Sequence, residues 1–338
     1  MNTRALLSVV LLGILARTAS AQFVLFPVSD PPVEPQGVCA GPDGAIWFTT
    51  GDRVGRLAVD GTITNFDLPM PESGARDIAA GPDGNLWFLE TNFLRVGRLS
   101  PTGTLAEFQI TPTRSWPDTI VAGPDGAMWF TDSLRGSIWR MTVTGDLTEF
   151  PVGSASPVGL VSGGDGNLWF ADFHSPGRIG RLRPSGEVAY FPIPTGSSGW
   201  RCGLGSDGRV WFTVIGRAFG RVGASGEVEE FPLEGEHGHI PASMALGPDR
   251  GLWMPVDESY ICVLPRNIQE RDALLRVASD GSQVRFELSS DLEISDGSRI
   301  TTGRDGSMWF TARRGLVRFF PRELDPRRPP TRVVAPRD

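Results

Sequence analysis

Short apolar segments separated by turn residues run along almost the whole chain. In one representative stretch these segments span residues 77–80, 85–89, 95–100 and 105–110, named strands A to D in chain order. Pro-Asp-Gly joins the first two, because proline presets φ, aspartate bonds to its own backbone and glycine tolerates positive φ. The pattern predicts four short antiparallel strands and shows no helical periodicity, so we expect an all-β fold.

The four-strand pattern recurs along the chain, and a Gly-x-Asp-Gly-x-aliphatic-Trp-Phe unit recurs with it between strands A and B. The repeated tryptophans are Trp47, Trp87, Trp129, Trp169, Trp211, Trp253 and Trp309, with spacings of 40, 42, 40, 42, 42 and 56 residues. Such a period with four strands is typical of a β-propeller blade, which buries its faces against its neighbours. The sequence therefore predicts a seven-bladed propeller of four-stranded blades over residues 22–322.

The seventh repeat lacks a fourth strand. Its strand C spans residues 315–320, and no strand D follows it. Residues 23–28, Phe-Val-Leu-Phe-Pro-Val, resemble the D strands at 147–152 and 188–193. We therefore expect the N-terminal strand to complete the last blade, which removes the exposed edge of an open array.

An arginine also occurs once in every repeat, in strand C. The set comprises Arg56, Arg98, Arg140, Arg181, Arg221, Arg276 and Arg318. A residue present in every blade is expected to have a structural role, so we predict that these arginines pair with the aspartates of neighbouring turns.

The two ends of the chain differ in composition from the repeats. Arg4, the apolar residues 5–16 and the small residues Ala19 and Ala21 form a secretory signal pattern over residues 1–21, with cleavage after Ala21. We therefore expect a secreted or periplasmic protein without a membrane span. Residues 323–338 are rich in Pro and Arg, lack apolar periodicity and are expected to form a disordered tail.

Charge and cysteine content narrow the classes of partner. The net charge of −7 argues against a surface that binds nucleic acid or anionic lipid. The three cysteines, Cys39, Cys202 and Cys262, are odd in number and too few for a disulfide framework, so we expect thiols. We expect a monomer that binds a small or peptide-like molecule at the mouth of its central channel.

The repeat units resemble those of a known family. Gly-Pro-Asp-Gly-Asn-Leu-Trp-Phe, Val-Gly-Arg-Leu and Gly-Thr-Leu-Ala-Glu-Phe, all in the second repeat, are similar to the repeats of the streptogramin B lyase (virginiamycin B lyase) family. The similarity extends over nearly all of residues 22–320. It implies a seven-bladed propeller that opens cyclic depsipeptide antibiotics by elimination, with a divalent cation that is typically magnesium.

The resemblance also implies two kinds of site residue. Catalytic histidines are expected in two late blades, five residues before the glycine that opens the turn. Those seven positions here hold Gln36, Arg76, Asp118, Val158, Trp200, Ala242 and Ser298, so no histidine is in register. Acids are expected three residues after the repeated tryptophan, where this chain has Glu90, Asp132 and Asp172. We predict that these acids bind a divalent cation such as Mg²⁺ at the channel mouth, the alternative being that they cap strand ends and face solvent.

The three histidines of the chain all fall in loops on one side of the predicted propeller. The D–A and B–C loops share this side, called the loop face below. His174 follows strand B of the fourth blade, whereas His237 and His239 lie between the fifth and sixth blades. In the segment Glu236-His237-Gly238-His239, a histidine oriented by Glu236 is suited to abstract a proton next to a carbonyl group. The alternative is an exposed polar loop.

Further residues on the loop face are predicted to contact the substrate. Gln36, Asp118, Trp200 and Arg201 lie at the heads of A strands, and His174 and Tyr260 lie in B–C loops. Tyr260 belongs to the segment 256–272, which makes the last repeat spacing longer than the others. A long loop over a propeller mouth is typical of a lid or a partner-binding ridge.

These features leave three functions open. The first is an exported, divalent-cation-dependent lyase that opens an ester- or lactone-containing compound by elimination. The second is a non-catalytic propeller that binds a ligand or a protein on its loop face. The third is a metal-dependent lactonase of the gluconolactonase type, which needs a cage of Glu, Asp and Asn oxygens around its cation.

Overall fold

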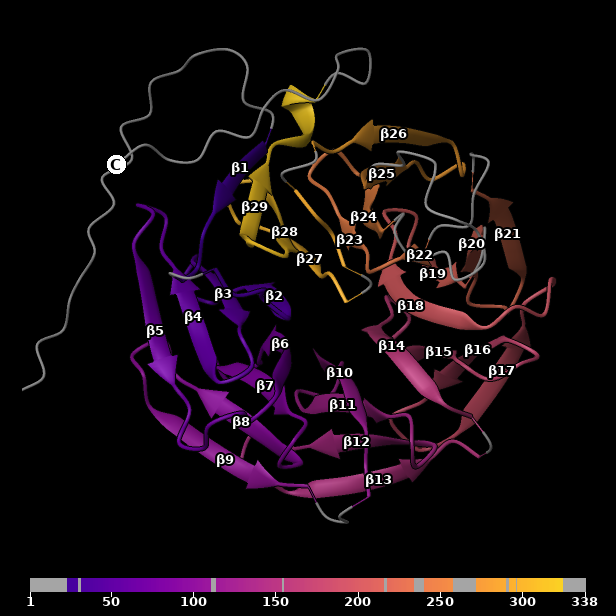
Figure 1. Cartoon of the computed structure of the whole chain (residues 1–338). Coiled ribbons are helices and arrows are strands. Elements are labelled where there is room, and N and C mark those ends of the chain that lie inside the picture. The colour runs from indigo at the N-terminus through magenta and orange to yellow at the C-terminus, as the bar shows by residue number, and fades with distance from the viewer. Residues whose placement is uncertain are drawn as a thin grey trace, which may run out of the picture.

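Seven antiparallel sheets surround a central axis, with one edge strand of each sheet nearest the centre (Figure 1). The computed structural model describes residues 23–29, 32–110, 114–153, 155–215, 218–233, 240–257, 272–289, 292–295 and 297–324. The predicted seven-bladed, all-β propeller is confirmed. The expected signal peptide at 1–21 lies outside the described residues.

The first five blades follow the predicted order of strands A to D. Blade 1 contains β2 (Gly37–Ala40), β3 (Ile46–Thr49), β4 (Arg53–Leu57) and β5 (Ile63–Asp67). Blade 2 contains β6 (Ala75–Ala80), β7 (Leu86–Glu90), β8 (Arg95–Leu99) and β9 (Leu105–Gln109). Blade 3 contains β10 (Pro117–Ala122), β11 (Met128–Asp132), β12 (Ser137–Met141) and β13 (Leu147–Pro151). Blade 4 contains β14 (Pro157–Ser162), β15 (Leu168–Asp172), β16 (Arg178–Leu182) and β17 (Val188–Pro192). Blade 5 contains β18 (Gly199–Leu204), β19 (Val210–Val214), β20 (Ala218–Val222) and β21 (Val228–Pro232).

The last two blades depart from this order. In blade 6, strand A is divided into β22 (Ile240–Pro241) and β23 (Ala245–Leu246), which both pair with β24 (Leu252–Asp257), followed by β25 (Ala273–Val277) and β26 (Gln283–Glu287). Blade 7 contains β27 (Ile300–Thr302), β28 (Met308–Ala312) and β29 (Gly315–Phe319) together with β1 (Phe23–Phe26). β1 pairs antiparallel with β29, so this sheet holds both the first and the last described strand.

The A strands form the inner wall of the propeller. β2, β6, β10, β14, β18, β23 and β27 each pack against the next, and β27 packs against β2 (Figure 1). Between adjacent blades lie apolar clusters built around the repeated tryptophans, six of which are 0–1% exposed. These clusters are the hydrophobic core, and their repetition around the ring holds the inner wall in place.

The turn aspartate links two repeated side chains within its own blade. In blade 1, Asp43 accepts hydrogen bonds from Trp47 Nε1 at 3.0 Å and from Arg56 Nε at 2.6 Å. Burial alone would raise the pKa of Asp43, but these two hydrogen bonds hold it below its ordinary value. The predicted pairing with a turn aspartate is confirmed for Arg56, Arg98, Arg140, Arg221, Arg276 and Arg318. Arg181 donates instead to the carbonyl oxygen of Ala224.

The folded part of the chain extends slightly beyond residue 322. A 3₁₀ turn, η1 (Pro321–Glu323), follows β29, and Leu324 packs against the core cluster of blade 7. The expected tail at 323–338 therefore starts two residues too early, and the rest of it lies outside the described residues. No helix in the described ranges has the length and apolar character needed to cross a membrane.

Two of the three cysteines lie in the described ranges. Cys39 and Cys202 are free, as predicted, whereas Cys262 lies outside them. Burial raises the pKa of both thiols well above its ordinary value, so neither is a reactive thiolate at neutral pH.

Candidate functional site

The A strands of blades 2 to 5 each contain a β-bulge. One extra residue opposes strand B between Ala75 and Ile78, Pro117 and Ile120, Val158 and Val161, and Gly199 and Cys202. A bulge changes the direction of the side chains it carries and is common beside functional sites. The bulges therefore set which polar residues project from the inner wall.

In four blades, a buried threonine on strand B fixes the backbone at the head of strand A. Its hydroxyl accepts a hydrogen bond of 2.9–3.2 Å from an amide at the head of strand A. The threonines are Thr49, Thr131, Thr213 and Thr311, and the amides belong to Gly37, Thr119, Arg201 and Arg299. Two of these amides belong to the arginines of the channel, whose backbone is thereby held in position.

Four charged side chains from four different blades meet in the channel. Arg201 of β18 forms a two-pronged ion pair with Asp118 of β10. Arg299, which precedes β27, pairs with Asp77 of β6 at 3.2 Å and lies 3.8 Å from Asp118. Asp77 also accepts a hydrogen bond from the amide of Ile120 at 2.9 Å. We call Asp77, Asp118, Arg201 and Arg299 the channel network.

The channel network is almost fully enclosed. The side chains of Asp118 and Arg201 are 8% and 6% exposed. Burial alone would raise the pKa of Asp118, but Arg201 and Arg299 hold it far below its ordinary value. The predicted substrate contacts Asp118 and Arg201 therefore bind each other, and the two carboxylates balance the two guanidinium groups.

Two glycines allow the inner strands of adjacent blades to approach each other closely. Gly37 of β2 lies against β6, and Gly159 of β14 lies against β18. A Cβ on Gly37 would lie 2.2 Å from the carbonyl oxygen of Arg76, and one on Gly159 would lie 2.6 Å from Cα of Arg201. Both positions therefore lack a side chain because the backbone of the next blade occupies that space.

Above the network, apolar side chains gather on the loop face of blades 3 to 5. We call Trp116, Leu134, Phe173 and Trp200 the aromatic rim. The first three are 53%, 55% and 43% exposed. The rings of Phe173 and Trp200 lie 5.3 Å apart, and the Trp200 ring packs under the Arg201 guanidinium at 4.3 Å.

Hydrogen bonds between loops join the members of the rim. Ser133, next to Leu134, donates its amide to the carbonyl oxygen of Trp116, and Ser156 donates its hydroxyl to the carbonyl oxygen of Ser133. The amide of Phe173 in turn donates to the carbonyl oxygen of Ser156 at 3.0 Å. The loops that carry Trp116, Leu134 and Phe173 are thus joined by hydrogen bonds.

Two other predicted contacts have different surroundings. His174 lies beside Phe173 on the loop face with 62% of its side chain exposed, so it can contact a ligand on the rim. Gln36 directs its amide to the carbonyl oxygen of Glu34 within its own loop. Glu236, His237, His239 and Tyr260 lie outside the described residues.

The three predicted cation ligands do not form one cluster. Asp132 accepts hydrogen bonds from the amides of Trp116 and Arg135, and Asp172 accepts from the amides of Ser156 and His174. These two acids therefore cap loops of their own blades, as in the alternative considered for them, but both are fully buried and do not face solvent. In the ranges that the structure describes, no group of three His, Cys, Asp or Glu side chains is placed to hold a metal ion.

Glu90 differs from the two aspartates. Its carboxylate is fully buried, and neither oxygen has a hydrogen-bond partner among the described residues. Arg95, which is placed to pair with it, binds Glu107 at 2.9 Å, whereas Arg178 at the equivalent place in blade 4 binds Asp172 at 2.7 Å. Burial, with a contribution from Glu107, raises the pKa of Glu90 to about 7.

Replacing Glu90 with glutamine is expected to stabilise the protein at alkaline pH. Because Glu90 keeps its proton up to about pH 7 when folded but loses it near its ordinary value of 4.5 when unfolded, stability falls as pH rises between these values. Glutamine has no such proton to lose, so the variant's free energy of unfolding should exceed that of wild type by about 1–3 kcal/mol at pH 8. Urea unfolding at pH 5 and pH 8 measures it. Asp172→Asn is the matched control and should destabilise; a Glu90→Gln variant with the same pH dependence as wild type would contradict the assignment.

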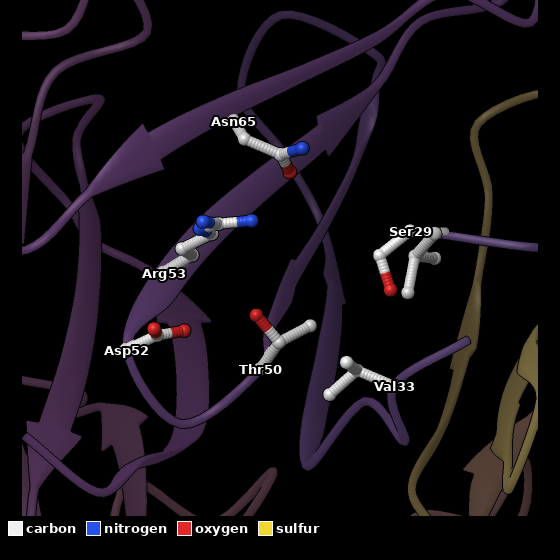
Figure 2. Close-up of a pocket in the computed structure, with 7 residues that line it drawn as sticks. Ser29, Val33, Thr50, Asp52, Arg53 and Asn65 are labelled. Atoms are coloured by element: carbon white, nitrogen blue, oxygen red, sulfur yellow. The ribbon is translucent and has the colours of Figure 1, made fainter. Parts of the chain in front are cut away.

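A small pocket lies at the junction of blade 1 and the segment that follows β1. It has a volume of about 200 Å³, and Arg53 and Asn65 line one side of it while Ser29 and Val33 line the other (Figure 2). Arg53 is already paired with Asp67 at 2.8 Å. No predicted site residue lines this pocket, and its volume is below the usual range for ligand sites.

Comparison with known proteins gives a family match over most of the chain. The sequence profile described as the virginiamycin B lyase family matches residues 10–264. Virginiamycin B lyases of Bordetella parapertussis and Bordetella bronchiseptica are each 48% identical over 46 residues, which is 13% of this chain. The matched segment spans 15% of the length of these curated relatives.

Solved structures superpose on a larger part of the chain than these curated relatives match in sequence. A streptogramin B lyase structure superposes with a TM-score of 0.76 and 25% identity, covering 88% of this chain and 96% of that one. A catalytically inactive virginiamycin B lyase from Staphylococcus aureus, solved with quinupristin, has a TM-score of 0.77 and 24% identity over 88% of this chain and 97% of that one. At that identity the second likeness shows the fold alone.

Proposed function

The chain belongs to the virginiamycin B lyase family, and on that premise we propose that it binds a cyclic, ester-containing peptide-like compound on its loop face. The aromatic rim carries this proposal. Exposed aromatic side chains that lie together on one face mark a binding surface, because each ring buries a large area against a ligand at little entropic cost. The secretory signal pattern supports the further proposal that this binding occurs outside the cytoplasm.

The channel network gives the rim a rigid floor. Trp200 belongs to the rim, and its neighbour Arg201 belongs to the network, so the two parts meet in β18. Because Asp118 holds the guanidinium that covers the Trp200 ring, the ring is fixed before a ligand arrives. Preorganisation of this kind reduces the entropy lost on binding.

Ring opening by elimination is the second candidate function, and family membership favours it. The residues available for it are His239 or His237 as base, oriented by Glu236. A magnesium ion, when bound, would stabilise the charge that develops next to the carbonyl group. Glu90, Asp132 and Asp172 do not fit as a shared set of ligands for that ion. The lactonase alternative needs a similar cage, and the described residues do not support it either.

Removing the rings of the rim is expected to weaken ligand binding. We expect Trp116→Ala and Phe173→Ala each to raise the Kd for quinupristin about tenfold, since buried aromatic contacts dominate such surfaces. Isothermal titration calorimetry measures the change. Val59→Ala is the matched control, because Val59 is 85% exposed but lies in the turn between β4 and β5, on the opposite side from the loop face.

The same samples separate binding from catalysis. After incubation with Mg²⁺, we expect mass spectrometry to recover quinupristin unchanged. A ring-opened product that disappears with EDTA and in the His239→Ala variant would replace our proposal with the lyase function. No binding of quinupristin by the wild-type protein would overturn the proposal itself.

A further inference from the structure

Three hydrogen-bond donors in the inner wall of blades 5 and 6 have no acceptor in the part of the chain that the structure describes. They are Nε1 of Trp200, Nε of Arg201 and the hydroxyl of Ser243, and each of these atoms is buried without a partner among the described residues. Arg201 and Ser243 are only 5% and 8% exposed as whole residues. A buried donor without an acceptor is costly, so three of them in one region need an explanation.

Two of the three donors, those of Arg201 and Ser243, belong to equivalent places in neighbouring blades, and Trp200 precedes Arg201. Trp200 and Arg201 form the bulge of β18, and Ser243 stands four residues before the turn glycine of blade 6, as Arg201 does in blade 5. The strands are in contact, because a Cβ on Gly203 of β18 would lie 2.3 Å from the side chain of Met244, the neighbour of Ser243. The donors thus belong to neighbouring inner segments, Trp200 and Arg201 to β18 of blade 5 and Ser243 to the segment between β22 and β23 of blade 6.

Their chemistry specifies the missing partner. The indole Nε1 and the guanidinium Nε can only donate, so the partner must be an acceptor. Arg201 already has Asp118 as its counter-ion, and the channel network contains equal numbers of carboxylates and guanidinium groups. An additional anion would therefore be a buried charge without a counter-ion, whereas a neutral carbonyl oxygen satisfies the donors at no such cost.

We propose that Trp200, Arg201 and Ser243 form a subsite that accepts an ester or amide carbonyl oxygen of the ligand. This inference rests on the proposed function, since the carbonyl belongs to the compound bound by the aromatic rim. Trp200 connects the two surfaces: its ring is only partly buried and lies 5.3 Å from the exposed ring of Phe173. A carbonyl of a compound bound on the rim thus approaches the donors from the loop face, beside the fixed Trp200 ring.

Two substitutions remove single donors with little change of shape. In Trp200→Phe and Ser243→Ala, we expect the Kd for quinupristin to rise about three- to tenfold, as for one lost hydrogen bond. Without ligand, both variants should unfold at the same temperature as wild type or higher, because a costly unpaired donor has gone. A loss of affinity without a loss of stability separates a ligand contact from a structural role.

Ser289→Ala is the matched control, since the Ser289 hydroxyl is also buried and unpartnered but follows β26 at the outer edge of blade 6. It should leave the Kd for quinupristin unchanged. If the wild type binds quinupristin and both donor variants bind it equally well, the subsite is excluded and the proposed function stands. If the wild type does not bind quinupristin, the subsite and the proposed function are both overturned. A saturable rise in unfolding temperature with acetate would overturn the choice of a neutral acceptor.

Discussion

Asp118→Ala is expected to lower the free energy of unfolding by about 3–5 kcal/mol, because it leaves Arg201 charged, buried and unpaired. Arg201 is 5% exposed and has both of its terminal nitrogens on Asp118, so water cannot replace the lost carboxylate. Arg299 loses its second carboxylate in the same step. Urea unfolding at neutral pH measures the change.

The double variant Asp118→Leu with Arg201→Met tests the reason for this loss. Replacing both charges with apolar side chains of similar size should recover most of the stability, since the cost comes from an unpaired buried charge. Asp67→Ala is the surface control; it breaks an exposed pair with Arg53 and should cost less than about 1 kcal/mol. A loss of that small size in Asp118→Ala would show that the channel is hydrated.

The number of blades and their internal contacts could be predicted from the sequence because they repeat. The turn aspartates, repeated tryptophans and strand C arginines satisfy one another within a blade, as for Asp43, Trp47 and Arg56. Strand A was predicted less well: the segment at 77–80 proved to be β6 (Ala75–Ala80). The bulge adds a residue there that no turn signal marks.

The channel network was missed because its residues are not all at the same place in the repeat. The family resemblance implied site residues five residues before the turn glycine, and in blade 3 this position holds Asp118. The other three members stand one residue later, at Asp77, Arg201 and Arg299. A pairing across four blades depends on the curvature of the closed ring, which repeat spacing does not reveal.

The aromatic rim had a signal that the sequence reasoning did not use. Ten tryptophans are present, and seven serve the repeat. The other three are Trp116, Trp139 and Trp200, two of which belong to the rim. Trp116 and Trp200 are at least partly exposed, whereas Trp139 is buried in the core cluster between blades 2 and 3. The acids behaved in the opposite way: Asp132 and Asp172 share a repeat position and serve their own blades.

Gly159→Ala is expected to destabilise the protein by about 2–5 kcal/mol, and two effects add up to this value. Gly159 has φ of +59°, a conformation that costs a residue with a side chain about 1–2 kcal/mol. The new methyl group would also lie 2.6 Å from Cα of Arg201 and 2.7 Å from the carbonyl oxygen of Trp200, which adds about 1–3 kcal/mol for overpacking. Urea unfolding measures the sum.

Gly166→Ala separates the two effects, because Gly166 in the same blade has φ of +76° but no atom within 4 Å of the added Cβ. Gly166→Ala should lower the free energy of unfolding only by the cost of positive φ, about 1–2 kcal/mol. The clash at Gly159 pushes β18 away from β14 and so moves Trp200 and Arg201 together, which should also weaken quinupristin binding. Equal losses of stability in the two variants would mean that β18 moves away from the added methyl group at no cost in free energy. The position of Arg201 relative to Asp118 would then not depend on Gly159.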